Sequence, residues 1–485
     1  MTVAASSEFL LLVFPLVFGN LIIYPAPNGA PTSNKFQIFV SQNGHRQQSH
    51  VYMTSSQHRT QDASHVKGGR TMSWTSFAFT GTRVTVEVHT PKDFHSCIVR
   101  PKSYGFNCHR TGNKVAQFDV TSNTKMMSVE FDYDYGSSNG GPDITDKLLV
   151  FADPPETQTP NKHDSSVLYY DVGVHDLSGQ KALDAHIKEV YLAPGAWVKG
   201  GFKSTGNHAV KIHGRGVMDT SAYRWHDKRF SWALINLDNG DHHTVEGITL
   251  SDPCYFFVRA LSDHNTVRNV KMVGAWIYNN DGVSTGSDGV VEDCFIHAND
   301  DAIKLYKDGI TVQRCVVWQA QNGAVFQTGW WDARHMKHVK VSDVDVIHTD
   351  WCTFKGSGNC HTSGNNAVLD QGGNTQDIAM SDIEFKNIRV EGSCPRLIYW
   401  RMHDGAHGTA SDIRFINWQV ESQPTQDSMH NEIAGTGNSG HVTNWQFVNF
   451  HIGGQCVNNP AHFDFQIDAH STSGFHFQCG GNPVG

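Results

Sequence analysis

The sequence has 485 residues, which is long enough for more than one ordinary domain and for a large buried core. Charged residues make up 18% of the chain and the formal net charge is −9. There is no basic patch of the kind that nucleic acid requires, so we expect no nucleic-acid partner. The same net charge disfavours polyanionic substrates, although a local group of cations could override it.

Residues 1–24 form a separate segment in the predicted organisation. They contain an apolar run, residues 9–19, that resembles the core of a secretory signal and is too short to span a membrane comfortably. No Lys or Arg precedes this run, so a native first strand and residues introduced for expression are alternatives. No other stretch could cross a bilayer, and we expect a secreted protein without membrane association.

Residues 25–155 are predicted to form a small antiparallel β-sandwich. Apolar and polar residues alternate, at least in part, in runs such as 36–40, 83–88 and 128–133, which is typical of strands with one face in water. Residues 156–166 continue a proline-containing stretch and are predicted to be a linker.

Residues 167–485 are predicted to form a right-handed parallel β-helix. Pairs of mostly apolar residues, three positions apart, recur at intervals of mostly about 20 to 30 residues. One such coil cannot bury its own apolar face, whereas stacked coils bury a continuous one. A β-propeller or a sandwich would also give short strands, but propeller blades repeat more steadily, at roughly 40 to 50 residues. The first members of the pairs are Val245, Val267, Val291, Val312, Val341, Phe385, Phe415 and Phe447.

Three aspartates occupy one level of consecutive predicted coils. With a short insertion assumed in the first of these coils, aligning residues 280–283, 300–303 and 322–325 at a shared small polar step places Asp281 beside Asp301, about 4.8 Å along the axis. Asp300 shares that side only if a turn or bulge separates it from Asp301, because neighbours in a strand point to opposite faces. Mutual repulsion should raise at least one carboxyl pKa. Structural capping of turns and calcium binding are the alternatives.

Further polar and aromatic side chains are predicted near these carboxylates. Lys304 could lower a neighbouring carboxyl pKa, bond a sugar hydroxyl, or simply face solvent. Aromatic rings close to the carboxylates are candidate platforms for sugars, although core packing is the usual role of tryptophan. The predicted substrate-binding residues are Lys304, Tyr306, Asn280, Asn322, Gln327, Trp330 and Trp331.

The ten cysteines favour an oxidising compartment over a metal site. None forms a CxxC pair, so zinc is not expected. Three pairs are close enough in sequence for local disulfides, namely Cys97/Cys108, Cys352/Cys360 and Cys456/Cys479. Cys294 and Cys315 share a register in adjacent predicted coils and could be bonded or stacked as free thiols. We expect secretion.

Several segments together resemble glycoside hydrolase family 49, the dextranase and isopullulanase family. They are residues 190–200, 299–306, 327–330 and 345–349, and the most specific part is Asp300-Asp301-Ala302-Ile303-Lys304 with Asp281 upstream. The resemblance implies a β-sandwich joined to a parallel β-helix and inverting hydrolysis of an α-glucan without metal or cofactor. Asp300 would be the general acid, and Asp281 and Asp301 would activate the water.

The chain also shares its aspartate arrangement with family 28 polygalacturonases, but the Gly-His-Gly and Arg-Ile-Lys motifs that handle galacturonate are missing. We therefore expect a monomeric, secreted endo-dextranase that cleaves α-1,6 links. Inversion would require acid and base carboxyls about 6.5 to 9.5 Å apart. Cleavage of α-1,4 links in pullulan, hydrolysis of a uronan, and a non-catalytic carbohydrate-binding solenoid are the alternatives.

Overall fold

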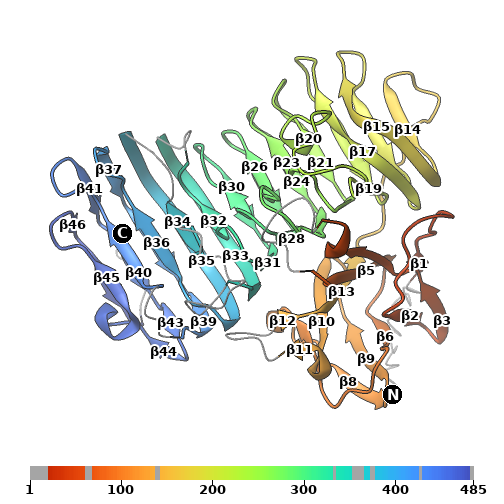
Figure 1. The fold of residues 1–485 in the computed structure, drawn as a ribbon, viewed down its shortest axis with the longest axis horizontal. Helices are drawn as coiled ribbons and strands as arrows, with labels where there is room; N and C mark the ends of the chain where they lie inside the picture. Colours follow the sequence, from red (N-terminus) through yellow and green to blue (C-terminus); the bar gives the residue numbers. More distant parts are fainter. Residues whose placement is uncertain are drawn as a thin grey trace, which may run out of the picture.

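The computed structural model describes residues 20–59, 68–136, 143–330, 335–351, 365–371, 377–424 and 429–480. Almost every element in them is a β-strand, and 34 strands belong to one parallel coil (Figure 1). The predicted fold class, a parallel β-helix preceded by a β-sandwich, is confirmed. Within the described ranges, no helix is long and apolar enough to cross a membrane.

Two sheets pack face to face in the sandwich, below the right-hand half of the coil in Figure 1. One consists of β1 (Leu21–Ile23), β4 (Tyr52–Ser55), β5 (Thr71–Phe79), β7 (Cys97–Arg100), β10 (Lys125–Phe131) and β13 (Asp146–Asp153). The other consists of β2 (Gln37–Gln42), β3 (His45–Ser49), β6 (Val84–His89), β8 (His109–Gly112) and β9 (Val115–Val120). The pairing of β13 with β5 is parallel, unlike its neighbours. Since β1 pairs with β5, the boundary predicted at residue 24 falls inside the sandwich.

A short hairpin and four single 3-10 turns complete the elements outside the main sheets. They are β11 (Tyr135–Gly136), β12 (Asp143–Ile144), η1 (Ser56–Arg59), η2 (Lys102–Tyr104), η3 (Asp132–Asp134) and η4 (Pro460–Phe463).

Strands of the coil stack in rows, in which most strands pair in parallel with one from the next coil. The coil opens with β14 (Val167–Tyr170), β15 (Gly173–Leu183), β16 (Glu189–Leu192), β17 (Ala196–Ser204), β18 (Lys211–Gly214) and β19 (Val217–Asp219). Three rows surround the middle coils. The first contains β21 (Thr244–Glu246), β24 (Thr266–Arg268), β27 (Val290–Glu292) and β30 (Thr311–Gln313). The second contains β22 (Thr249–Ser251), β25 (Lys271–Val273), β28 (Phe295–Ala298) and β31 (Val316–Gln319). The third contains β20 (Ala233–Asn236), β23 (Phe256–Ala260), β26 (Val283–Thr285), β29 (Ile303–Lys304), β32 (Phe326–Gln327) and β34 (Leu369–Gln371).

Later coils are built around two long strands, β33 (His335–Thr349) and β35 (Asp377–Ser393), which run through more than one row. The remaining strands are β36 (Ile398–Arg401), β37 (His407–Ser411), β38 (Ile413–Ile416), β39 (Gln419–Ser422), β40 (Asn431–Ala434), β41 (Gly440–Thr443), β42 (Gln446–Val448), β43 (His451–Ile452), β44 (Gln455–Cys456), β45 (Phe465–Ile467), β46 (Thr472–Ser473) and β47 (His476–Gln478).

The apolar anchors read from the sequence stack directly on one another. Val245 pairs with Val267, Val267 with Val291, and Val291 with Val312. The row continues through Val341, Phe385, Phe415 and Phe447. All of these side chains are buried in one continuous core. The register of the coil was therefore readable from its apolar repeat.

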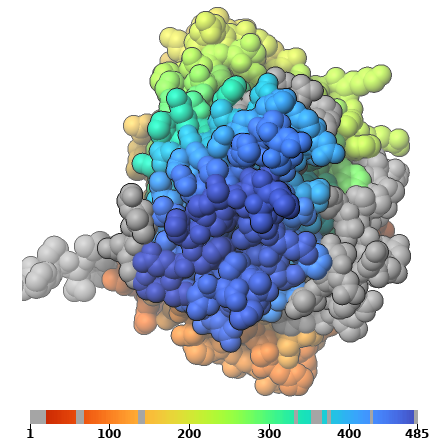
Figure 2. All heavy atoms as spheres, turned by 90° about the vertical axis from the view of Figure 1, so that its left-hand side faces the viewer, coloured from red at the N-terminus to blue at the C-terminus, as the bar shows by residue number. Residues whose placement is uncertain are grey.

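The sandwich lies against the side of the coil, so that it appears beneath the blue C-terminal coils in Figure 2. An apolar layer joins the two parts, with Trp74 and Phe151 of the sandwich packed among Trp197, Phe295 and Trp318 of the coil. Buried charges join them as well. They form a network in which Arg100 is ion-paired with Glu130 and Glu391, and Glu130 contacts His348 Nε2 at 2.6 Å.

Two of the proposed disulfides are present, Cys97–Cys108 and Cys456–Cys479. Cys294 and Cys315 are free, buried thiols, which resolves the alternative left open by the sequence. The third proposed pair, Cys352/Cys360, lies outside the described residues.

Candidate active site

Asp281, Asp300 and Asp301 come together in the structure. Each contributes one carboxylate oxygen to a group in which all three lie within 4.8 Å of one another. Asp281 precedes β26, and Asp300 and Asp301 lie in the turn between β28 and β29. That turn supplies the change of direction that two neighbouring aspartates need in order to share one side.

The register that brings them together is partly as predicted. Val283 pairs with Ile303, so Asp281 stands beside Asp301. Ile303 then pairs with Phe326, whereas the sequence alignment matched it to Val325. The third coil is thus shifted by one residue. Gly323, at φ 79°, lies so close to the turn that an added Cβ would stand 2.2 Å from the Asp300 carbonyl carbon.

Asp300 is the most exposed of the three, at 9%. Its Oδ2 accepts hydrogen bonds from the Asn279 N–H and from Asn322 Nδ2, both at 2.9 Å, and its Oδ1 accepts from the Asp301 N–H at 3.0 Å. Burial and the neighbouring Asp301 raise the Asp300 pKa from 3.8 to about 6, against a lowering by Lys304. The group therefore holds a proton in mildly acidic solution and can donate it.

Asp301 is saturated with hydrogen-bond donors. Its Oδ2 accepts from Lys304 Nζ at 2.7 Å and from Trp330 Nε1 at 2.8 Å. Its Oδ1 accepts from the Ala324 N–H at 3.1 Å and from Asn365 Nδ2 at 3.0 Å. Since a carboxylate offers about four lone-pair sites, Asp301 has little capacity left for a further donor.

Asp281 is held on one side only. Its Oδ2 lies 2.7 Å from Lys304 Nζ, whereas its Oδ1 is buried and accepts no hydrogen bond from any residue that the structure describes. Burial raises the Asp281 pKa well above its ordinary value, opposed by Lys304 and reinforced by Asp300 and Asp301. A buried polar atom without a partner requires an explanation, and a water molecule or a substrate group would supply one.

Lys304 occupies the position that a metal ion would take between the carboxylates. Its Nζ lies 2.7 Å from an oxygen of Asp281 and 2.7 Å from one of Asp301, and 3.3 Å from the Tyr306 hydroxyl. Asp281 and Asp301 raise the Lys304 pKa well above its usual range, although burial opposes them. An ammonium ion at this point neutralises part of the cluster and competes with calcium, which would need the same oxygens.

Two of the predicted substrate ligands make hydrogen bonds within the protein. Asn280 accepts hydrogen bonds from the Trp276 and Ile277 N–H groups and donates to the Pro253 and Tyr255 carbonyls, so its amide is fully used in holding the turn. Gln327 is completely buried, donates to Asp370 and accepts from the Gly329 N–H. Both side chains are held by internal contacts, and a role for either in binding substrate stays a prediction.

Of the other predicted ligands, three that the structure describes lie beside the cluster. Asn322 and Trp330 hold Asp300 and Asp301 through hydrogen bonds. Tyr306 lies against Lys304, and its pKa is raised well above its usual range by burial. Trp331 lies outside the described residues.

Sequence reasoning missed Asn279 and Asn365, which donate to Asp300 and Asp301. Asn279 has φ 57°, a left-handed conformation that Asn tolerates well, and Asn279-Asn280 before Asp281 was the available signal. Asn365 follows a long interval without a repeat anchor, so no sequence pattern placed it.

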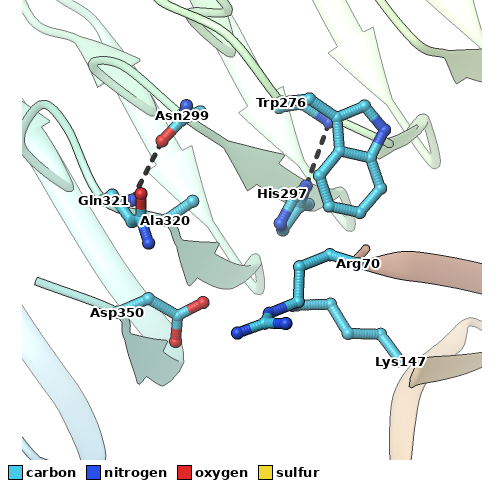
Figure 3. Close-up of a pocket in the computed structure, with 9 residues that line it drawn as sticks. Arg70, Lys147, Trp276, His297, Asn299, Ala320, Gln321 and Asp350 are labelled. Atoms are coloured by element: carbon cyan, nitrogen blue, oxygen red, sulfur yellow. Dashed lines mark hydrogen bonds between the residues drawn. The ribbon is translucent and has the colours of Figure 1, made fainter. Parts of the chain in front are cut away.

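A small pocket of about 30 Å³ lies on the same turns, where the sandwich meets the coil (Figure 3). Arg70 and Lys147 of the sandwich face Asp350, His297 and Trp276 of the coil across it. Burial, Lys147 and His348 lower the His297 pKa well below its ordinary value. None of the three clustered aspartates lines this pocket, so we place the chemistry at the cluster.

Comparison with curated proteins finds several relatives. A dextranase of Arthrobacter globiformis is 25% identical over 419 residues, which is 69% of this chain and 64% of that protein. A dextranase of Talaromyces minioluteus is 26% identical over 467 residues, covering 80% of this chain and 74% of that one. An isopullulanase of Aspergillus niger is 26% identical over 383 residues, 68% of each. The resemblance to glycoside hydrolase family 49 is confirmed.

The alignment spans less than two thirds of the Arthrobacter globiformis protein. Among solved structures, Dex49A from Penicillium minioluteum matches with a TM-score of 0.75 at 21% identity, covering 95% of this chain and 96% of that one. This match establishes the fold. A comparison with protein-family models found no match.

Proposed function

We propose that this protein is an endo-acting glycoside hydrolase that cleaves the α-1,6 links of dextran with inversion. The observation that carries the proposal is the group of three carboxylates within 4.8 Å. Two of them have raised pKa values, and one of these two has an oxygen that lacks a donor among the described residues. The dextranase names of the relatives support the choice of substrate.

Asp300 serves as the general acid in this proposal. It is the most exposed of the three, and its pKa of about 6 keeps the proton available in mild acid. The Asn279 N–H and the Asn322 amide fix its Oδ2, so the carboxyl is oriented before a sugar binds. The proton passes to the glycosidic oxygen as the bond to the anomeric carbon breaks.

Asp281 serves as the base that takes a proton from the attacking water, in the ionised state that the neighbouring Lys304 ammonium favours. Its Oδ1 is the acceptor with unused capacity, while Asp301, saturated by four donors, positions Lys304 and the turn. This narrows the sequence prediction, in which Asp281 and Asp301 shared the role equally.

The spacing of the carboxylates differs from the predicted 6.5 to 9.5 Å, since the closest oxygens lie within 4.8 Å. We nevertheless infer inversion from burial. Asp281 and Asp301 are only 2% and 1% exposed, too little to touch an anomeric carbon and form a covalent intermediate. A bound water extends the reach of a buried carboxylate by about 2.8 Å, the length of an O–H···O hydrogen bond.

A hydrolysis panel tests this function. Dextran, pullulan and polygalacturonate are incubated separately with the protein and with Asp300→Asn, and reducing ends are counted. We expect the wild-type protein to release reducing ends from dextran alone, and Asp300→Asn to release none. Following the first product anomer by NMR then reports inversion or retention. Binding of dextran without release of reducing ends would leave a carbohydrate-binding solenoid as the function.

Cleavage of pullulan is the second candidate, because the isopullulanase relative is as similar in sequence as the dextranases. Release of reducing ends from pullulan and not from dextran would select it. We further propose that the protein is secreted and monomeric. Its two disulfides fit an oxidising compartment, where such bonds persist.

A further inference from the structure

Trp232 stands apart from the other tryptophans. Of those that the structure describes, it is the only exposed one, at 57%. It closes the turn before β20 with φ 60°, a left-handed backbone conformation in which a bulky side chain is a true outlier. An exposed ring gains nothing from the core, so packing does not explain why a strained position carries tryptophan. Strain of this kind gathers at functional sites.

Two chains of contacts connect Trp232 to the three aspartates. On one side, its ring lies 6.4 Å from the ring of Phe256, and Lys304 Nζ lies 5.2 Å above that ring. Lys304 in turn binds Asp281 and Asp301.

On the other side, the Trp232 ring lies 6.1 Å from Tyr255, which stacks on His226 at 4.4 Å. His226 Nε2 lies 2.8 Å from Asn279 Oδ1, and the Asn279 N–H donates to Asp300. A series of aromatic and amide contacts therefore connects the Trp232 ring to Asp300, the proposed acid.

The register fixes how far along the axis the ring lies. Ala233 pairs with Phe256, and Val258 pairs with Val283, so the coil of Trp232 is two coils before that of Asp281. Asp301 is one coil further. At about 4.8 Å per coil, Trp232 lies roughly 10 Å from the level of Asp281 and 14 Å from that of Asp301. A substrate long enough to cover this distance is a chain of sugars and not a single ring.

We propose that Trp232 is a platform on which one sugar ring of the polysaccharide stacks, at a subsite remote from the bond that is cleaved. The proposal rests on the proposed function and names a residue that sets its preference for long chains. The C–H face of a pyranose is apolar and matches an exposed indole face, while sugar hydroxyls remain in water. A rigid aromatic ring also loses little side-chain entropy on binding.

The experiment compares Trp232→Ala, Trp232→Phe and the control Val174→Ala, an exposed apolar residue of β15. Each is assayed on dextran and on isomaltotriose. Trp232→Ala is expected to raise KM for dextran at least tenfold with little change in kcat, to leave isomaltotriose kinetics unchanged, and to be largely rescued by Phe. Equal KM values for dextran in wild type and Trp232→Ala would overturn the proposal.

A binding measurement separates this proposal from the hydrolytic one. Retardation by dextran in affinity electrophoresis is measured for wild type and Trp232→Ala without any need for turnover. If the protein binds dextran but hydrolyses nothing, weaker retardation of Trp232→Ala would still support the platform, and equal retardation would refute it. If pullulan proves to be the substrate, pullulan and maltotriose replace the two probes.

The variant Trp232→Gly tests whether weaker dextran binding could result from misfolding. Glycine adopts φ 60° without strain, so this variant should melt at the same temperature as wild type or higher, and still bind dextran at least tenfold more weakly. A Trp232→Gly protein that melts several degrees lower would show that the ring is structural, and would also overturn the proposal.

Discussion

Replacing Asp300 by Asn should remove nearly all turnover. The variant should also gain stability relative to wild type as the pH rises. The Asp300 pKa is about 6 in the folded protein and 3.8 in the unfolded chain. Below pH 3.8 the group is protonated in both states and contributes nothing. Between the two values the unfolded chain releases the proton and the folded protein keeps it, so wild type loses stability with rising pH. Asn does not titrate and escapes this loss.

The magnitude follows from the same two pKa values. A difference of about two pH units corresponds to about 3 kcal/mol at neutral pH, of which about 2 kcal/mol develops between pH 4 and pH 7. The substitution also costs about 1 kcal/mol at every pH, because the new amide cannot satisfy the Asp301 N–H and the Asn279 N–H with one oxygen. The change with pH isolates the carboxyl from this constant cost.

Urea unfolding followed by tryptophan fluorescence measures the effect. The difference in unfolding free energy between Asp300→Asn and wild type is determined at pH 4 and pH 7. Asp404→Asn, a substitution at an exposed turn, provides the matched control. The reasoning would be refuted if this difference stayed constant between pH 4 and pH 7, or if it changed in favour of wild type as the pH rises.

Three further predictions concern the same cluster. Lys304→Met leaves the carboxylates of Asp281 and Asp301 without their shared cation, so the unfolding free energy at pH 7 should fall by about 3 to 5 kcal/mol, and by less at pH 4, where a proton on Asp281 replaces the cation. Equal losses in urea at both pH values would contradict this. The hydrolysis rate should decline as the pH rises above about 6, because Asp300 must donate a proton; a rate that climbs to pH 8 would exclude it as the acid. Dialysis against EDTA should leave the rate unchanged, since the Lys304 ammonium stands between the carboxylates, and a loss restored by calcium would show a metal site.

The stacking of the coil could be predicted because one physical signal recurs in every coil. A buried anchor such as Val291 has to pair with its counterparts in the coils before and after it, and the sequence shows each of them. Since parallel pairing transmits register, the neighbours Asp281 and Asp301 followed from the anchors once a short insertion was assumed in the coil of Asp281. The pairing of Ile303 with Phe326 is shifted by one residue from the predicted register. The shift lies where Gly323 lets the backbone come close to the preceding turn, and a pattern of apolar residues does not show such a close approach.

The surroundings of the cluster were less readable, because they come from contacts between distant segments. Asn365 reaches Asp301 across 64 residues, and Trp330 reaches it across 29. The aromatic platforms near the cluster stay predictions. The Trp330 indole N–H is directed to Asp301, and among the described tryptophans the exposed ring belongs to Trp232, three coils earlier than Asp301.

The sandwich explains how buried like charges can be tolerated at one point of the coil. Trp276 Nε1 donates to Thr54 of the sandwich, and the Trp276 backbone N–H donates to Asn280, next to Asp281. Thr54 also donates to Asp252 at 2.8 Å, one coil earlier. The turn that carries Asp281 is therefore fixed from outside the coil, by a domain that contacts none of the three carboxylates among the described residues. Repulsion within the cluster would otherwise relax by moving this turn, and the raised pKa values that proton transfer requires would be lost.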